Sequence, residues 1–206
     1  MTWSKRMLDL VVATLLTAFL WPVGVVVTIT LLITEGRPLF YLSERMKTPT
    51  EAFTLVKFRT MRAATEAGNT GVTGGDKSDR MSPVHQFLRK TRADELPQIW
   101  NVFRGDISLV GPRPPLRVYV EDYPEIYGPV LQARPGVTGL ASLVFHDHEE
   151  RLLAACTTAA ETDEVYRTRC IPRKAQLDLI YQRQRSLCSD LRLIGKTAAK
   201  PFRRDP

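Results

Sequence analysis

The longest apolar run in the chain covers residues 10 to 33, LVVATLLTAFLWPVGVVVTITLLI, which are 24 consecutive residues without a charge. A straight helix of this length is long enough to cross a bilayer. However, Pro22 and Gly24 divide the run into two arms of about 12 residues, each roughly 18 Å long and too short to cross alone. Because proline removes a helical hydrogen bond and kinks the helix, the pattern favours a re-entrant helix that enters one leaflet and returns.

Positive charges flank this run on both sides. Lys5 and Arg6 precede it, and Arg37, Arg45 and Lys47 follow it. The positive-inside tendency then places both ends in the cytoplasm. The alternative is one straight spanning helix, which could leave the following domain outside the cytoplasm. No small-residue cleavage site follows the run, so a signal peptide fits poorly. We therefore expect a membrane-inserted segment at residues 1–36 and a domain on the cytoplasmic face at residues 37–206.

The residues after the apolar run predict strands, then a loop and a short helix. The stretch LFYLSERM reads as a strand, and the alternation of Phe53 and Leu55 predicts a second, half-buried strand that delivers Lys57 and Arg59 to one end. Residues 64–79 are rich in Gly, Thr, Asn, Asp and Ser, which is typical of an exposed loop. The segment DKSDRMSPVHQFLRK predicts a turn and a short helix, with His85 on the helix surface.

An adjacent pair of carboxylates precedes the next predicted helix, at residues 96–103. Proline is tolerated in the first helical turn, so Pro97 indicates that this helix begins close to Asp94 and Glu95. The two acids then lie at the positive end of the helix dipole, where anions, including phosphate, are stabilised. An apolar stripe at offsets 0, 3, 4 and 7, formed by Leu96, Ile99, Trp100 and Phe103, is expected to dock against core or lipid.

The C-terminal third is predicted to be helical. Residues 149–170 read as a helix with a polar surface. The last helix carries apolar side chains at offsets 0, 4 and 7 with basic side chains around them: Leu187, Leu191 and Ile194, with Arg192, Lys196 and Lys200. It is suited either to the membrane interface or to core packing with one solvated face. The predicted fold is therefore α+β, a small mostly helical domain with short strands, an N-terminal re-entrant membrane helix and interfacial amphipathic helices.

Composition and charge narrow the class of protein. A chain of 206 residues can bury one good core. Lys and Arg outnumber Asp and Glu by 29 to 22, and residues 171–206, with nine basic and three acidic side chains, carry +6 of the total +7. Because no nucleic-acid motif is present, a membrane surface is the favoured partner of this basic tail and nucleic acid is not expected. The three cysteines lack metal-like spacing and are expected to be free thiols.

Residues 92–114 contain a long, irregular motif, RxDELPQxxNVxxGDxSxVGPRP. Secondary structure alone does not require such a string. It closely resembles the catalytic signature of the bacterial sugar transferase family, the monotopic phosphoglycosyl transferases. The resemblance extends to KFRTM at residues 57–61, RPGVTG at residues 134–139 and the LDxxY segment that begins at Leu177. The family usually continues RPG(I/V)TG with Trp-Ala-Gln, where this chain has Leu-Ala-Ser, so the sugar stays open.

The resemblance implies transfer of a sugar 1-phosphate from a UDP-sugar to polyprenol phosphate, undecaprenyl phosphate being the expected carrier, with release of UMP. This is the first membrane step of glycoconjugate assembly, at the cytoplasmic face of the bacterial inner membrane. By the same analogy Asp94 is the nucleophile that forms an aspartyl phosphosugar, and Glu95 is a ligand of Mg²⁺. The implied substrate-binding residues are Lys57, Arg59, Arg80, Arg89, Arg113, Arg134 and Asp178.

Two further interpretations are open at this stage. A non-enzymatic, membrane-anchored adaptor that binds anionic lipid or a polysaccharide-assembly partner would explain the apolar run and the basic tail, but not the motif at residues 92–114. The exposed amphipathic surface also leaves room for a homodimer. A metal cluster within residues 145–149 is disfavoured, because adjacent residues seldom all point at one ion.

Overall fold

The computed structural model of the protein describes residues 2–61 and 81–200. The predicted Arg80 site residue and the loop expected at residues 64–79 lie outside these ranges. The elements are α1 (Trp3–Thr34), β1 (Phe40–Met46), β2 (Ala52–Phe58), α2 (Pro83–Lys90), η3 (Ala93–Glu95), α3 (Gln98–Arg104), β3 (Ser108–Val110), α4 (Arg117–Asp122), α5 (Pro124–Val130), β4 (Gly136–Thr138), α6 (Leu140–Val144), α7 (His146–Ala154), α8 (Ala159–Val165), η4 (Tyr166–Cys170), α9 (Ile171–Gln184) and α10 (Leu187–Ala199). The predicted class, mostly helical with short strands, is confirmed.

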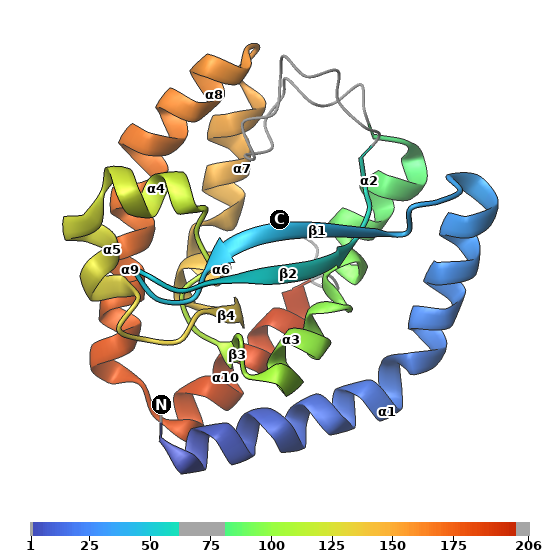
Figure 1. Ribbon diagram of the computed structural model, residues 1–206, viewed down its shortest axis with the longest axis horizontal. Helices are drawn as coiled ribbons and strands as arrows, with labels where there is room; N and C mark the ends of the chain where they lie inside the picture. Colours follow the sequence, from blue (N-terminus) through green and yellow to red (C-terminus); the bar gives the residue numbers. More distant parts are fainter. Residues whose placement is uncertain (1, 62–80, 201–206) are drawn as a thin grey trace.

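The hairpin of β1 and β2 lies at the centre of the molecule (Figure 1). The strands are antiparallel, with Tyr41 opposite Lys57 and Arg45 opposite Phe53. Because side chains alternate along a strand, Tyr41 and Arg45 share one face with Lys57 and Phe53. Phe53 and Leu55 are buried, so the predicted half-buried strand is confirmed. The hairpin therefore carries an inward face that holds both apolar core and cations.

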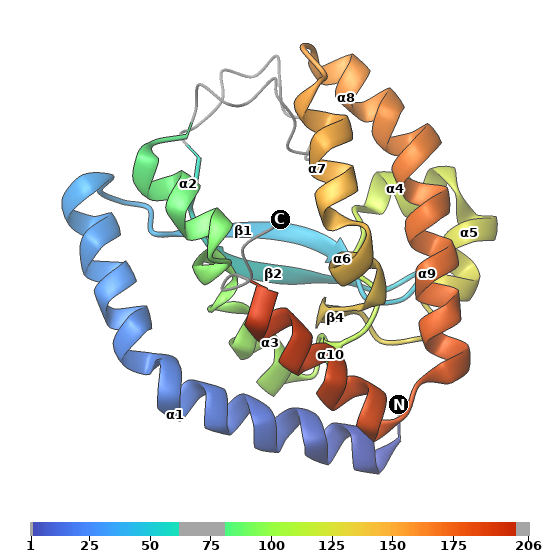
Figure 2. The ribbon, with the colours of Figure 1, turned by 180° about the vertical axis from the view of Figure 1, so that it is seen from behind.

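The other helices form two groups around the hairpin. Figures 1 and 2 place α4, α5, α7, α8 and α9 at one end of the strands, and α2, α3 and the second arm of α1 at the other. The first group shares a core cluster that includes Met46, Tyr119 and Ile171. A second cluster, which includes Ala13 of α1 and Val102 of α3, lies under the hairpin. This arrangement holds the hairpin between the membrane-type helix and the rest of the domain.

Charged side chains fasten the start of α1 to the domain. The Lys5 ammonium donates to Asp190 of α10 at 2.7 Å, and Arg6 donates to the carbonyl oxygens of Val102 and Phe103 at 2.7 and 2.9 Å. Asp9, which is 1% exposed, accepts hydrogen bonds from the Ser108 hydroxyl and from a β3 backbone N–H. From the sequence, Lys5 and Arg6 were interpreted only as charges that flank a membrane segment. In the structure their side chains bind α10 and α3 and so attach α1 to the domain.

The rest of α1 is a long, bent and largely exposed apolar helix. It continues through Pro22 without ending, and Figure 1 shows it running along one side of the domain and then turning along another. It is the one helix among residues 2–61 and 81–200 that is long and apolar enough to cross a membrane. Its exposed residues include Leu15, Phe19, Trp21 and Val26. The bend expected at proline is thus present, although the helix does not break.

The end of α1 also contacts the domain. Arg59 donates to the Glu35 carbonyl oxygen at 3.1 Å, just beyond the last helical residue. The Glu35 carboxylate lies 3.8 Å from the His85 ring. His85 is fully buried, so the expectation of a surface histidine was wrong. The physical reason is the packing of α2 against the end of α1, which covers the His85 ring with Glu35. His85 also completes a capping box with Ser82 at the third position of α2.

The short parallel pair of β3 and β4 brings two glycine-containing segments into backbone contact. Ser108 pairs with Gly136, and the Gly136 N–H donates to the Pro112 carbonyl oxygen at 2.8 Å. A Cβ atom on Gly136 would overlap the backbone of Val110 and Gly111, and one on Gly111 would overlap the Arg134 carbonyl oxygen. The RPGVTG segment therefore supports the loop that carries Arg113.

The predicted C-terminal helices are present with one interruption. Between α7 and α8 the chain turns, and Thr158 caps α8 through the Glu161 N–H, so residues 149–170 are not one helix. In α10, Leu193 and Asp190 are buried, whereas Leu187 and Leu191 are 43% and 50% exposed. This helix packs on the core with one face and leaves apolar side chains exposed on another. The core-packing reading is therefore confirmed, and the membrane-interface reading stays a prediction.

Gly136→Ala tests the backbone contact between the two glycine segments. The added methyl group meets backbone atoms that cannot rotate away, so we expect a loss of about 1–3 kcal/mol in unfolding free energy. Gly128→Ala is the matched control, because no atom lies within 4 Å of a Cβ placed there in α5. In a helix, alanine is favoured over glycine by about 1 kcal/mol, so the control should unfold no earlier than wild type. Equal thermal midpoints for the two variants would contradict this account of the loop.

Candidate active site

Local backbone geometry presents the two acids side by side. Arg92 adopts a left-handed conformation with φ of 57°, which is uncommon for a residue other than glycine. The chain then makes a 3₁₀ turn over Ala93–Glu95, and α3 begins at Gln98 with Pro97 as its cap. The predicted helix start near the acids is confirmed, with the regular helix beginning two residues later than residue 96. Asp94 and Glu95 therefore lie in a tight turn rather than inside the helix.

Three cations surround the Glu95 carboxylate. The Lys57 ammonium and the Arg113 guanidinium both donate to Oε1, at 3.2 and 3.0 Å. Arg92 lies 3.6 Å from Oε2. Glu95 is 8% exposed, and a buried carboxylate requires such partners. The ion cluster therefore joins β2, the turn of the two acids and the loop after β3.

Asp94 has a different environment from its neighbour. Its side chain is 7% exposed, and among the described residues it has no hydrogen bond or ion pair. Lys57, Arg89 and Arg113 act on it electrostatically without contacting it. The Asp94 carboxylate is thus surrounded by positive charge but is not bound to any of it, which leaves its oxygens available to a ligand.

The two acids have opposite electrostatic shifts. Burial would raise the pKa of Glu95, but Arg113, Lys57 and Arg92 outweigh burial and hold this pKa well below its usual range. Burial and the negative charge of Glu95 raise the pKa of Asp94. Paired groups with separated pKa values are a common basis for different catalytic roles. Glu95 is suited to be a fixed anion, and Asp94 to be the more basic, reactive carboxylate.

A buried asparagine sets the distance between β2 and the acids. Asn101, which is 1% exposed, donates to the Thr54 carbonyl oxygen at 2.8 Å and accepts from the Val56 N–H at 3.1 Å. Its amide also donates to Asp106 at 3.0 Å. Because Val56 precedes Lys57, these bonds fix Lys57 against Glu95. Asn101 and Asp106 are both fixed positions of the motif at residues 92–114, which could have indicated this role. The sequence analysis assigned no role to either residue.

The predicted site residues do not all converge. Lys57 and Arg113 contact Glu95, and Arg89 lies near enough to Asp94 to affect its pKa. Asp178 is 6% exposed and lines a small cavity together with Arg113. Arg80 is outside the described residues. Arg92, by contrast, was not selected from the sequence but is part of the cluster.

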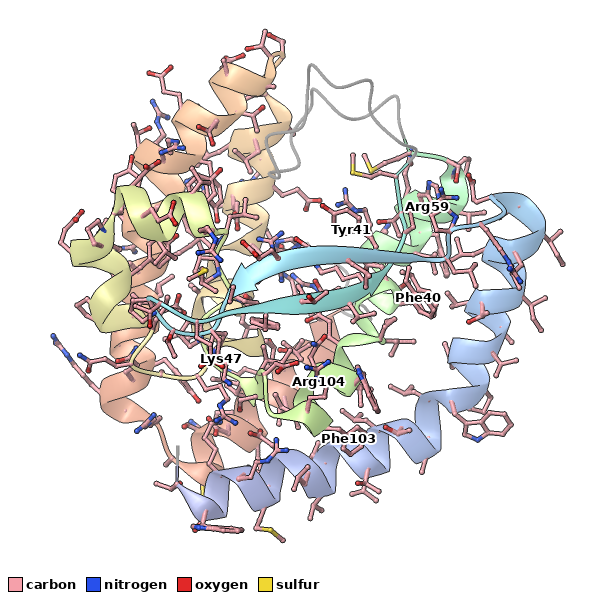
Figure 3. All side chains as sticks on the ribbon, in the orientation of Figure 1. Phe40, Tyr41, Lys47, Arg59, Phe103 and Arg104 are labelled. Carbon is pink, nitrogen blue, oxygen red and sulfur yellow. The ribbon has the colours of Figure 1, made fainter. Side chains whose placement is uncertain are left out.

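Arg59 and Arg134 lie elsewhere. β2 ends at Phe58, so alternation no longer directs Arg59 to the face of Lys57, and its guanidinium instead reaches the end of α1 (Figure 3). The Arg134 guanidinium lies beside Gly105, at the end of α3 opposite the acids. Neither residue contacts the acid cluster among the described residues, because each follows the local path of its own segment. Their part in substrate binding stays a prediction.

A large apolar groove opens next to the acids. It has a volume of about 610 Å³ and lies between both arms of α1, the outer face of the hairpin and α3. The predicted stripe of Leu96, Ile99, Trp100 and Phe103 lines it, and Figure 3 shows Phe103 on the part of α3 that faces α1. Leu96 directly follows Glu95 in the chain. The groove therefore extends to the residue that follows the acid pair in the chain.

A second group of possible metal ligands lies on α7. Atoms of His146, Asp147 and Glu150 come within 4.8 Å of one another, partly because helical spacing places residues 146 and 150 on one face. Asp147 is also paired with Lys200, and the neighbouring Glu149 with Lys174. Exposed groups of this kind are common without an ion, so the group adds nothing to the site.

Comparison with known proteins agrees with the sequence motif. The sequence model of a family described as bacterial sugar transferase matches residues 1–204. The chain belongs to this family. The predicted family membership is thereby confirmed, and it extends over almost the whole chain.

Several curated bacterial sugar transferases are similar to it. A UDP-glucose:undecaprenyl-phosphate glucose-1-phosphate transferase of Caulobacter vibrioides is 36% identical over 94% of this chain and 67% of its own length. A protein of the same name from Xanthomonas campestris pv. campestris is 30% identical over 96% of this chain, but only 38% of its own length. A UDP-N-acetylgalactosamine-undecaprenyl-phosphate N-acetylgalactosaminephosphotransferase of Aeromonas hydrophila is 30% identical over 94% of this chain and 42% of its own length. This chain therefore corresponds to less than half of some relatives.

The electrostatics of Lys57 can be tested by titration. Burial lowers the pKa of Lys57 to about 8, while the charge of Glu95 counteracts part of that shift. Raising the pH through about 8 should therefore neutralise the ammonium group. In Glu95→Gln the stabilising charge is lost, so Lys57 should titrate at still lower pH, as followed by NMR of the ammonium group.

Glu51→Gln serves as the control for this titration. Glu51 pairs with Lys47 on the same hairpin, 2.9 Å away, but is not part of the acid cluster. This variant should leave the Lys57 titration unchanged. A Lys57 pKa near the ordinary value of 10.5 in wild type would refute the proposed environment.

Proposed function

We propose that this chain transfers a sugar 1-phosphate from a UDP-sugar to polyprenol phosphate and releases UMP. The observation that carries the proposal is the acid pair itself: an Asp94 carboxylate with a raised pKa and no bond to another described residue, beside a Glu95 carboxylate bound by cations. Relatives named as transferases of glucose 1-phosphate or N-acetylgalactosamine phosphate to undecaprenyl phosphate support the substrate classes. The particular sugar is not specified by these contacts.

The excess of positive charge at the site suits a diphosphate substrate. Lys57, Arg89, Arg92 and Arg113 outnumber the two carboxylates that they surround. A diphosphate repels an anionic nucleophile, and fixed cations lower that repulsion as charge shifts during phosphoryl transfer. Arg113 can bind phosphate oxygens in the bidentate manner typical of guanidinium groups. The cluster can therefore hold the donor while Asp94 remains available.

The reaction has two displacements at one phosphorus atom. A carboxylate oxygen of Asp94 bonds to the sugar-bearing phosphorus, and the bond from that phosphorus to UMP breaks, so UMP leaves with the bridging oxygen. A phosphate oxygen of polyprenol phosphate then bonds to the same phosphorus, and the bond to Asp94 breaks. The carboxylate is regenerated, and polyprenol diphosphate sugar is the product. Covalent catalysis of this kind divides one difficult transfer into two easier ones.

The acid pair also fits Mg²⁺, which takes carboxylate and phosphate oxygens as ligands. Within residues 2–61 and 81–200 the Asp94 oxygens have no hydrogen-bond partner, and Arg92 lies 3.6 Å from the Oε2 atom of Glu95. These two carboxylates would hold the ion. When bound, Mg²⁺ would neutralise charge on the diphosphate oxygens. Lys57 and Arg113 would meanwhile keep Glu95 in place through its other oxygen.

The apolar groove is suited to the prenyl chain of the acceptor. It runs from Trp21 and Val25 of α1 to Leu96 and Pro97, directly beside the acids. A prenyl chain in this groove would place its phosphate next to Asp94. Because the groove is bounded by the exposed apolar helix α1, a lipid could enter from a bilayer without passing through water.

Both ends of α1 contact the same domain, which supports a re-entrant membrane helix. Lys5 binds α10 near the start of α1. At the other end, the Glu35 carbonyl oxygen accepts from Arg59, and the Glu35 carboxylate lies 3.8 Å from the His85 ring. A helix that spanned the bilayer would place these ends on opposite sides, where one domain could not hold both. Donor nucleotide sugars are cytoplasmic, so the domain would lie on the cytoplasmic face of the inner membrane, with the exposed leucines of α10 as a second contact.

Removal of the nucleophile gives the most direct test of the reaction. With UDP-sugar, Mg²⁺ and no acceptor, wild-type protein should release about one UMP per chain and gain the mass of a sugar phosphate. Asp94→Asn should show neither result, and its turnover with acceptor should fall at least about 1000-fold, because amides are poor nucleophiles. Asp147→Asn, on exposed α7, is the control and should retain the burst.

The same experiment distinguishes the adaptor hypothesis. An adaptor would release no UMP from any member of a broad UDP-sugar panel. A different result would be an Asp94→Asn variant that is folded by circular dichroism and turns over at the wild-type rate. This result would refute Asp94 as the nucleophile but would not contradict the proposed transferase activity.

Narrowing the groove should affect the lipid acceptor alone. Val25 lines the groove, whereas the adjacent Val26 is 62% exposed and does not. We expect Val25→Trp to displace about two methylene groups of the prenyl chain, worth about 1.6 kcal/mol, and to raise the KM for polyprenol phosphate about tenfold. The UMP burst without acceptor should be unchanged, and Val26→Trp should resemble wild type. Equal KM values for both variants would contradict this role for the groove.

A further inference from the structure

Arg45 is a cation of the inward hairpin face that the reaction outlined above leaves unused. It lies on β1, four residues beyond Tyr41, the partner of Lys57. Because side chains alternate along a strand, Arg45 lies on the same face as Lys57. The small residue Ser43 lies between Tyr41 and Arg45 on this face of β1. The Arg45 Nε–H donates to the Ser43 hydroxyl at 3.1 Å, which directs the guanidinium back along the strand. Arg45 therefore borders the acid cluster from the side.

No carboxylate compensates the charge of Arg45 among residues 2–61 and 81–200. Ser43 is its hydrogen-bond partner there, and its two terminal nitrogens are not engaged. Burial, followed by the like charge of Arg113, lowers the pKa of Arg45, although a guanidinium stays charged. A buried cation that faces a second cation is unfavourable unless an anion joins them. Arg113 is paired with Glu95, whereas Arg45 has no carboxylate partner among the described residues. Arg45 is therefore the cation that an anionic ligand can neutralise.

A polar cavity lies between Arg45, Arg113 and α9. Its volume of about 50 Å³ suits a few waters or a phosphate-sized group and is too small for a hexose or a nucleoside. Asp178, with one buried carboxylate oxygen that has no hydrogen-bond partner among the described residues, and Tyr127 also line the cavity. Burial raises the pKa of Asp178 to about 7, so in its protonated form this carboxyl group can donate to a phosphate oxygen instead of repelling it. Lys174 completes the lining and is paired with Glu149. Asp178 and Tyr127 are buried, and Arg45, Arg113 and Lys174 are partly exposed, so the cavity is a polar subsite with Arg45 at its edge.

The position of this subsite distinguishes between the two substrates. The cavity is lined by α5, α9 and the loop of Arg113, and it shares no residue with the apolar groove. The groove begins at Phe40, at the start of β1, whereas Arg45 lies near the end of that strand. The two hollows therefore approach the acid cluster from different sides. A lipid phosphate delivered from the groove would reach Asp94 before it reached Arg45.

We propose that Arg45, together with Arg113, binds a phosphate of the soluble nucleotide donor, on the side of the leaving UMP. This inference rests on the proposed function and adds a substrate-binding residue to it. The phosphate relieves the repulsion between the two guanidinium groups. After transfer it departs with UMP, so Arg45 discriminates the nucleotide from the lipid acceptor.

Kinetics of Arg45→Gln with separate variation of the two substrates test this assignment. A charge-assisted hydrogen bond contributes about 1.5–3 kcal/mol, so the KM for UDP-sugar and the inhibition constant of UMP should each rise about 10- to 100-fold. The KM for polyprenol phosphate should change less than about twofold. Arg45→Lys keeps the buried charge but loses bidentate geometry, so it should give a smaller increase in the same two constants. Because it retains the cation, this second variant keeps the test decisive if Arg45→Gln does not fold.

Arg117→Gln is the matched control. Arg117 contacts Glu44, the neighbour of Arg45 in β1, at 2.8 Å on the surface, so its loss should leave all three constants at wild-type values. The inference is overturned if the Arg45 variants resemble this control, or if the increase falls on polyprenol phosphate. Wild-type protein that releases no UMP from any UDP-sugar would overturn the proposed function itself, which is a separate outcome.

Discussion

The buried carboxylate of Glu95 is the interaction on which the site depends. A charge with so little exposure must be paired, and its partners come from distant segments: Lys57 from the hairpin and Arg113 from the loop after β3. The pairing brings three parts of the chain to one point. It also leaves Asp94 beside fixed positive charge and without a hydrogen bond or ion pair to any residue that the structure describes. Glu95 thus orders the site, while Asp94 is the carboxylate proposed to react.

Much of the surrounding scaffold serves to hold these partners in place. Asn101 bonds to the Thr54 carbonyl oxygen and the Val56 N–H on one edge of β2, next to Lys57, and the close backbone contact at Gly136 supports the loop of Arg113. Arg6 binds carbonyl groups at the far end of α3, whose first turn follows the acids. The helix bounded by these contacts has only seven residues, so it cannot maintain its position by its own stability. External hydrogen bonds therefore fix its location.

The bent helix α1 links this polar centre to an apolar environment. Its first arm is anchored by buried charges, including Asp9, and its far end is held through Glu35. The space inside the bend is the apolar groove, which ends at Leu96 beside the acids. A cationic cavity at Arg45 lies on another side of the same centre. The architecture thus separates an apolar approach from a polar approach, as the proposed reaction between a lipid and a nucleotide sugar requires.

The sequence by itself determined the elements whose signals are local. The acid pair, the helix start set by Pro97, the apolar stripe from Leu96 to Phe103, the half-buried strand and the bend near Pro22 all depend on neighbouring residues and periodicity. Only the tertiary structure decided which groups the polar side chains contact and which of these side chains are buried. Arg59 reaches a helix terminus and His85 is buried, because contacts between residues far apart in sequence outweigh the surface preference of each residue type. Burial and pairing with distant groups are set by packing, and no local pattern records them.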